Sequence, residues 1–300
     1  MRGSNIDLRI LGTMIRKRIE EQRKDHPILH MIPVAKKVLE ARRVLIQGVS
    51  LLLKVFPVLA CKSCPEVFIG NEGHLIQSCR GYSGCGDNQL HEWGPGSIND
   101  ILVPVEAYHL QKMSRGITKH HQRFDHDRVP AVLELCCRAC AIQHEEILEL
   151  SKTSEKNPYV FNEDHRTLSG ENLRYVAEGT VMAWETVRAC VKKLLWAYPS
   201  KVCRHCSEVH IGHNVGGKAR LCCGLQGGIH VWENAHVNDL VPEKLVWHRR
   251  PQDPSVLLNE CREYYGHAPA VVSLCRHAGA VVPSKYLIRM KPKGLSHPCH

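Results

Sequence analysis

Two cysteine pairs, each with a gap of two residues, stand out in this chain of 300 residues. A third cysteine and at least one histidine follow each pair, and thiolates and imidazoles are donors that zinc prefers. A two-residue gap lets both thiolates of one turn face the same ion, and the later donors complete the coordination. The candidate ligands are Cys61, Cys64, His74, Cys79 and His91 in the first half and Cys203, Cys206, Cys222 and His230 in the second. The spacing therefore predicts zinc as the cofactor, with two ions per chain.

The sequence leaves the choice of four ligands at each site open. The first half offers five donors, and the second half departs from it because Gly217 stands where His74 predicts a histidine. If both sites share one geometry, His74 is either an alternative ligand or a residue that contacts a ligand. The second site then uses His230. Other nearby donors in the second half are His210, His213 and Cys223.

The expected role of the metal is structural. A closed set of four protein ligands leaves no position for the water that a catalytic zinc needs. The chain has no P-loop, GxGxxG, GxSxG or HExxH pattern, and the HxE at 144–146 is not followed by the PCxxC of zinc deaminases. We therefore predict that the protein is not an enzyme and has no small-molecule substrate.

The remaining cysteines are expected to be reduced packing residues. The 15 cysteines are an odd number, and the amino end lacks the features of a secretory leader, which argues against a disulfide framework. A free cysteine is commonly buried as a small apolar residue. The most apolar stretch, 44–61, is interrupted by polar residues and falls short of the about 20 apolar residues that a membrane span requires. No membrane partner is predicted.

The chain is a tandem duplication. LLLKVFPVLACKSCPEVFIG at 51–70 aligns with KKLLWAYPSKVCRHCSEVHIG at 192–212, and VPAVLELC at 129–136 aligns with APAVVSLC at 268–275. Self-similarity of this length is typical of repeated structural units. We predict a basic N-terminal segment, a first repeat, a linker, a second repeat and a basic C-terminal tail, at 1–31, 32–143, 144–173, 174–282 and 283–300.

Each repeat is predicted to place its metal ligands between two helices. Apolar residues recur at helical intervals before each cysteine pair, and Pro57 or Pro199 ends that pattern. The runs PEVFIG and SEVHIG after the pairs are typical of a strand in a small hairpin. A further helix begins near Pro130 or Pro269, because proline is tolerated in a first turn. The predicted class is α+β, with two tandem repeats, each an amphipathic helix, a small zinc-bound β-hairpin region, a loop and a further helix.

Basic residues surround the predicted metal sites. The net charge of +10 suits a polyanionic partner, and cations that contact phosphates bind by counterion release without reading sequence. Tyr82, near Arg80, is a candidate for stacking on a base, whereas Trp93 and Trp232 are expected to pack over the metal sites. The candidate RNA contacts are Lys62, Arg80, Tyr82, Lys119, Arg123, Lys201, Arg204, Lys218, Arg220, Arg249 and Arg250.

The doubled motifs resemble those of the APO family of plant organelle proteins, named for accumulation of photosystem one. The resemblance rests on CKSCPEVFIGNEGHLIQSC, HEWGPGSINDILVPVEAYHL and RFDHDRVPAVLELC, with their second copies CRHCSEVHIG, HVWENAHVNDLVPEKLVWH and HAPAVVSLC. It covers nearly all of the chain from Pro33 onward. The stretch MIPVAKKVLEARRVLIQGVSLLLKVFPVLAC is most similar to the fourth family member, which is of the mitochondrial type.

This resemblance implies a zinc-containing RNA-binding protein that assists the splicing of organellar group II introns, or RNA maturation, without catalysing it. The expected partners are structured intron RNA and other organellar splicing factors. The alternative is that the zinc modules are protein-interaction surfaces in an organelle ribonucleoprotein complex. The resemblance implies a mitochondrial location, with the chloroplast as alternative, although residues 1–23 show no clear targeting leader.

Overall fold

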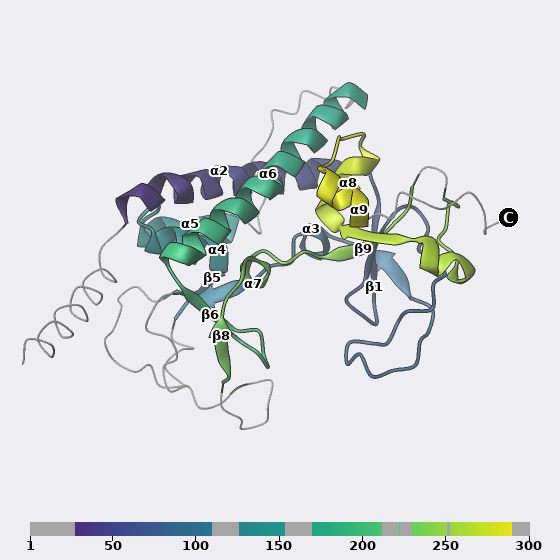
Figure 1. The fold of residues 1–300 in the computed structure, drawn as a ribbon, viewed down its shortest axis with the longest axis horizontal. Helices are drawn as coiled ribbons and strands as arrows, with labels where there is room; N and C mark the ends of the chain where they lie inside the picture. The colour runs from purple at the N-terminus through teal and green to yellow at the C-terminus, as the bar shows by residue number, and fades with distance from the viewer. Residues whose placement is uncertain are drawn as a thin grey trace, which may run out of the picture. The chain divides into compact units, whose positions relative to one another are not determined.

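The computed structural model describes residues 28–109, 126–153, 170–211, 222, 230–250 and 253–289. Two long helices, α2 (Ile32–Leu53) and α6 (Gly170–Ala197), precede the cysteine pairs (Figure 1). Each ends a few residues before the proline that the sequence marks as its end. Their buried residues recur at intervals of three or four, so each helix buries one face, as the apolar pattern predicts.

A small antiparallel sheet follows each long helix. In the first repeat, β1 pairs with both β2 and β3, and Cys61 lies opposite Trp93. In the second repeat, β6 pairs with both β7 and β8, and Cys203 lies opposite Trp232. The strands are β1 (Val58–Cys61), β2 (Val67–Ile69), β3 (Trp93–Pro95), β6 (Ser200–Cys203), β7 (Val209–Ile211) and β8 (Trp232–Asn234). The predicted hairpin regions are therefore confirmed, each with a third strand.

The carboxyl-terminal part of each repeat pairs two strands and then forms a buried helix. Pro130 and Pro269 each stand immediately before that helix, one residue outside the predicted first turn. In the first repeat the elements are α3 (Ile98–Ile101), β4 (Glu106–Tyr108), β5 (Arg128–Pro130), α4 (Ala131–Arg138) and α5 (His144–Thr153). In the second they are α7 (Val237–Leu240), β9 (Leu245–His248), the 3-10 helix η3 (Asn259–Tyr264), β10 (Gly266–Pro269), α8 (Ala270–His277) and α9 (Ser284–Arg289). A short 3-10 helix, η1 (Leu29–Met31), precedes α2. The mixed α+β class and the repeated order of elements agree with the prediction.

The compact units of the structure do not follow the repeat boundaries 32–143 and 174–282, because each unit combines parts of both repeats. Unit 1 comprises Met1–Lys36, Glu106–Lys152 and Val191–His236, and unit 2 comprises Lys37–Val105, Thr153–Cys190 and Val237–His300. The predicted linker 144–173 also contains α5 and the first residues of α6.

Strand pairing and core packing explain this exchange between the repeats. In unit 1, β4 of the first repeat runs parallel to β7 of the second, which gives a five-stranded sheet in the order β5-β4-β7-β6-β8. In unit 2, Phe68 and Ile76 of the first repeat share a buried cluster with Leu257, Cys261 and Tyr265 of the second. A three-stranded sheet buries little apolar area alone, so each hairpin is stabilised by the strands and helix of the other repeat.

The two units differ at one buried polar position. In unit 1, His109 Nδ1 lies 2.6 Å from Glu134 Oε2, and Arg138 Nε donates a hydrogen bond to Glu134 Oε1 at 2.9 Å. The repeat alignment places His248 at the position of His109 and Ser273 at that of Glu134. Within the described residues, neither ring nitrogen of His248 nor the Ser273 hydroxyl has a hydrogen-bond partner.

This difference leaves a buried histidine without a counter-charge in unit 2. The side chain of His248 is buried, and burial, together with the positive charges of Arg276, His277 and Arg250, lowers its pKa to about 3. His248 therefore stays neutral in the folded protein at physiological pH.

Most described cysteines are free packing residues or candidate ligands. Twelve are free, among them the buried Cys136, Cys190 and Cys275. Cys261 is disulfide-bonded, so the expectation of reduced thiols is wrong at this residue.

Candidate metal centres

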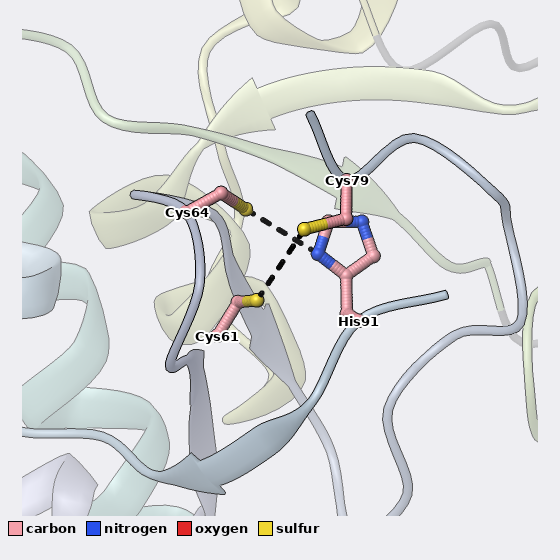
Figure 2. A group of neighbouring side chains, drawn as sticks. All are labelled: Cys61, Cys64, Cys79 and His91. Carbon is pink, nitrogen blue, oxygen red and sulfur yellow. Dashed lines mark hydrogen bonds between the residues drawn. The ribbon is translucent and has the colours of Figure 1, made fainter. Parts of the chain in front are cut away.

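The first centre brings together Cys61, Cys64, Cys79 and His91 in unit 2 (Figure 2). Their ligand atoms all lie within 4.8 Å of one another, and all four residues are buried. The sulfur atoms of Cys61 and Cys79 are 3.9 Å apart, and Cys64 Sγ lies 3.4 Å from His91 Nδ1. A tetrahedral zinc with bonds of about 2.3 Å to sulfur and about 2.0 Å to nitrogen places two sulfur atoms about 3.8 Å apart and a sulfur and a nitrogen atom about 3.5 Å apart. The donor set therefore fits a tetrahedral zinc.

The second centre repeats this arrangement in unit 1. It brings together Cys203, Cys206, Cys222 and His230, of which Cys206 is half-buried and the others are buried. Cys203 Sγ lies 3.6 Å from Cys222 Sγ, and Cys206 Sγ lies 3.7 Å from His230 Nδ1. Of the other donors considered from the sequence, His213 and Cys223 lie outside the described residues, and His210 lies on β7 outside this group.

The sheet and its turns position the ligands. Cys61 is the last residue of β1, and its amide N–H donates a hydrogen bond to the carbonyl of Glu66 at 2.9 Å, which closes the turn that carries Cys64. Cys79 is held by two backbone hydrogen bonds with Gln89, and His91 stands two residues before Trp93 of β3. Three segments of the first repeat thus converge on one point, as Figure 2 shows.

One thiol in each centre is set to ionise easily. Burial alone raises the pKa of a thiol, yet the pKa of Cys61 is lowered because backbone N–H groups, foremost that of Ser63 at 3.4 Å, donate to its sulfur. Burial is likewise outweighed at Cys203, where the N–H groups of His205 and Cys206 lower the pKa to about 6. The turn therefore favours a thiolate, the form that binds metal.

The other cysteine of the first pair behaves in the opposite way. Burial, with the neighbouring Cys61 and Cys79, raises the pKa of Cys64 to about 12. A group of thiolates packed this closely repels itself, and a divalent cation among them removes that penalty.

His74 supports the first centre without joining the group of four. Its Nδ1 accepts a hydrogen bond from the Ile76 N–H at 3.3 Å, and its Nε2 lies 2.8 Å from Glu66 Oε1. His74 also belongs to a second group, with Glu66 and His91, whose ligand atoms all lie within 4.8 Å of one another and could hold a metal ion. Its ring contacts that of His91, with centroids 4.9 Å apart, and the choice between the two roles that the sequence leaves open for His74 stays a prediction.

Glu66 orients the histidine ligand. Its second oxygen lies 3.4 Å from His91 Nε2 and 3.3 Å from the Ser78 hydroxyl, which in turn lies 2.9 Å from His91 Nε2. Burial lowers the pKa of His91, and a neutral ring that donates from Nε2 leaves the Nδ1 lone pair facing the cysteines. Carboxylates that orient histidine ligands in this way commonly strengthen metal binding.

Sequence reasoning missed Glu66 and Ser78. A signal for Glu66 was present, because a glutamate stands two residues after the second cysteine of each pair, as Glu66 and Glu208.

A tryptophan covers each centre, as expected from the sequence. Trp93 stacks on His91 with ring centroids 4.8 Å apart, and Trp232 stacks on His230 at the same separation. Gly73 makes room for Trp93, because a Cβ at this position would lie 2.0 Å from the indole ring. Of the two neighbouring residues Gly73 and His74, the first therefore makes room for Trp93 and the second contacts Glu66.

The predicted RNA contacts divide into exposed and buried residues. Lys62 pairs with Glu92 on the surface, and Arg204 is equally exposed, with Nη1 3.7 Å from Glu233 Oε1. Arg80 is exposed and donates to Asn88, and Tyr82 is 73% exposed. Lys201 is half-buried, with Nζ 2.6 Å from the side-chain oxygen of Asn234.

Arg249 and Arg250 differ from the surface cations. Arg249 is half-buried and donates to the Pro254 carbonyl at 3.3 Å. Arg250 is buried and forms an ion pair with Asp253 at 3.1 Å, so the expectation that it faces RNA is wrong in this structure. Four other candidates lie outside the described residues, namely Lys119, Arg123, Lys218 and Arg220.

Comparison with known proteins identifies relatives over nearly the whole chain. A family model described as APO RNA-binding matches residues 2–147 and again residues 150–295. The chain is 32% identical to APO protein 1, chloroplastic, of Arabidopsis thaliana, over 95% of this chain and 73% of that protein. It is 36% identical to APO protein 2, chloroplastic, of the same plant, over 87% of this chain and 66% of that protein.

A third relative has a different organelle in its name. The chain is 30% identical to APO protein 3, mitochondrial, of Arabidopsis thaliana, over 91% of this chain and 76% of that protein. No solved structure matches the chain significantly. Across the described part of the chain, no helix combines the length and the apolar character needed to cross a bilayer.

Proposed function

The chain belongs to the APO RNA-binding family, and from that premise we propose that it binds RNA in a plant organelle and assists group II intron splicing without catalysing it. The observation that carries the proposal is a surface feature that occurs in both repeats. Each unit presents an exposed cation directly after its first cysteine ligand, Lys62 after Cys61 and Arg204 after Cys203. Cations held on a rigid turn can contact phosphates of a folded RNA with little loss of conformational entropy.

We propose zinc as the ion at both centres. Zinc would supply the fixed tetrahedral geometry that holds each small sheet closed, which is a structural role. The three cysteines and one histidine of each group would be its ligands, with Glu66 and His74 orienting His91 in the first centre.

The organelle is proposed from the relatives. Two of them are chloroplastic and one is mitochondrial. We keep the mitochondrion as the proposed location, with the chloroplast as the alternative. The similarity of this chain to the fourth family member also stays a prediction.

Charge reversal at exposed hairpin residues tests the RNA proposal. The triple variant Lys62→Glu, Arg80→Glu, Arg204→Glu is expected to bind a structured intron RNA at least tenfold more weakly. The magnitude of the slope of log affinity against log salt should fall by about 2 to 3, because each of the three lost phosphate contacts contributes about 0.7 to 0.9. The matched control reverses three exposed lysines away from the hairpins, namely Lys36 and Lys37 on α2 and Lys54 directly after it. Equal losses in both variants would overturn the assignment to the hairpins.

Two further measurements separate the parts of the proposal. If the wild-type protein binds RNA no better than a neutral polymer at 50 mM salt, RNA binding is refuted and the protein-interaction alternative takes its place. Crosslinking to tagged protein, followed by sequencing of the bound RNA, identifies the transcripts and the organelle together. Recovery of transcripts without introns would refute the splicing role while leaving RNA binding intact.

A further inference from the structure

The strand pair β9 and β10 of unit 2 turns one face outward. Val246 and His248 of β9 are buried, whereas Leu245 is exposed and Trp247 is half-buried. Side chains alternate between the two faces of a strand, so Leu245 and Trp247 share the outer face. His267 of β10 is exposed and lies directly opposite Trp247 in the strand register. The outer face of this strand pair therefore carries two neighbouring rings.

The rings of Trp247 and His267 are in contact. Their centroids are 4.0 Å apart, and their planes are tilted by 43°. Trp247 also packs against the buried cluster of unit 2, and its ring lies 6.3 Å from that of His74, measured between centroids. The ring of His74 contacts Trp93, which stacks on the candidate ligand His91. A row of rings thus leads from the first metal centre to the exposed His267.

Unit 1 carries a matching pair at the same positions of the repeat. The repeat alignment places Tyr108 at the position of Trp247 and Arg128 at that of His267. Tyr108 of β4 and Arg128 of β5 lie opposite each other in the strand register. The guanidinium carbon of Arg128 is 5.3 Å from the centre of the Tyr108 ring. Each unit therefore places an aromatic ring beside a planar group that contains nitrogen.

Stability of the strand pair alone does not explain this repetition. Many combinations of residues stabilise a cross-strand pair. The other outward position of the first strand differs between the units, because Glu106 stands in unit 1 and Leu245 in unit 2. The position that keeps its chemistry combines the two kinds of side chain on which unpaired RNA bases stack, namely aromatic rings and planar groups such as guanidinium.

We propose that each of these pairs is a platform on which an unpaired base of RNA stacks, Trp247 with His267 in unit 2 and Tyr108 with Arg128 in unit 1. The inference rests on the proposed RNA binding and adds single-stranded RNA as the form that the platforms recognise. Bases inside a duplex are already stacked on one another, whereas those of a loop, a bulge or an end can be splayed out onto a protein surface.

The charge and the rigidity of the platforms suit this ligand. The side chain of Arg128 is 56% exposed, and it lies 3.4 Å from the equally accessible Glu106, so a phosphate can replace this surface ion pair at little cost. In unit 2 the apolar Leu245 leaves no carboxylate at that position. Because packing holds Trp247 in place, a base that stacks there meets a preformed surface, which lowers the entropy cost of binding.

A single-stranded oligouridylate that carries one 2-aminopurine tests the proposal with the full-length, zinc-loaded protein. Stacking quenches the fluorescence of this base analogue, so binding to the wild type should quench it. At about pH 8, where histidine is ordinarily uncharged, His267→Ala should weaken binding at least about fivefold. The slope of log affinity against log salt should stay unchanged, because no phosphate contact is lost. His267→Phe keeps a flat ring and should bind as the wild type does.

Matched variants check the fold and the second platform. His30→Ala removes an exposed histidine of η1 and should leave binding unchanged. In unit 1, Tyr108→Leu is expected to cause a loss similar to that of His267→Ala, whereas Tyr108→Phe should retain binding. Urea unfolding of each variant shows whether a loss of affinity comes from a loss of structure.

An RNA duplex of the same length separates the outcomes. His267→Ala should bind the duplex as the wild type does. Unchanged affinity of His267→Ala for the single strand, an equal loss with both RNAs, or a loss that His267→Phe shares would overturn the platform while the wild type still binds RNA. A wild type that binds neither RNA refutes the proposed RNA binding and the platform together.

Discussion

The buried His248 should make unit 2 sensitive to mild acid. Its pKa of about 3 in the folded protein lies well below the ordinary value of about 6.5 for histidine. When the pH falls from 7.5 to 5.0, the unfolded chain therefore takes up a proton at this position and the folded chain does not. Stability falls with falling pH wherever the unfolded state binds more protons, so the folded state loses stability over this window.

The expected loss follows from these two pKa values. At pH 5.0 His248 is almost fully protonated in the unfolded chain and neutral in the folded one, and the free energy of unfolding drops by about 2 kcal/mol relative to pH 7.5. The metal ligands also take up protons as the pH falls. The quantity to measure is therefore the difference between wild type and His248→Gln, in urea unfolding at both pH values.

The first repeat supplies the compensating variant. Ser273→Glu places a carboxylate at the position that Glu134 holds in unit 1, beside His248 and near His277. This variant should gain about 1–3 kcal/mol at pH 7.5, because the buried imidazole acquires a partner, and should lose most of the acid sensitivity. Glu134→Ser should cost about 3–5 kcal/mol, since it leaves His109 and Arg138 without their carboxylate. Identical acid losses in wild type and His248→Gln would refute the reasoning.

Three other outcomes are expected. Glu66→Gln should raise the zinc dissociation constant of the first centre about 10- to 100-fold in chelator competition, whereas the exposed Glu72→Gln should leave it unchanged. Metal removal, or Cys61→Ser, should abolish the near-ultraviolet circular dichroism of the stacked Trp93, an effect that the exposed Cys85→Ser does not share. A chain of residues 1–150 should give a poorly dispersed nuclear magnetic resonance spectrum, and adding residues 151–300 should restore dispersion, because each unit needs both repeats. A well-folded isolated repeat would contradict the last expectation.

The local features of this protein could be read from its sequence. The helices before the cysteine pairs follow from the spacing of apolar residues, and the small sheets follow from short apolar runs bounded by turns. The groups of four ligands arise from the same local order, because a Cys-x2-Cys turn and the strand that pairs beside it bring their side chains to one point. Such patterns involve neighbours along the chain, and backbone geometry alone relates them.

Tertiary structure decided the partners of these elements. The apolar run SEVHIG predicts β7 as a strand, whereas β4 lies in a stretch expected to be a loop, and only the packed fold pairs the two across the repeats, since an open strand edge accepts any complementary neighbour. The contact of His74 with Glu66 depends on the packed fold, and so does the burial of Arg250, which pairs with Asp253. Likewise, the lack of a hydrogen-bond partner for His248, in contrast to His109, depends on the side chains that the described fold packs around each ring. Residue types and spacings determine which local elements form, whereas burial and charge pairing depend on segments that meet only when the whole chain has packed.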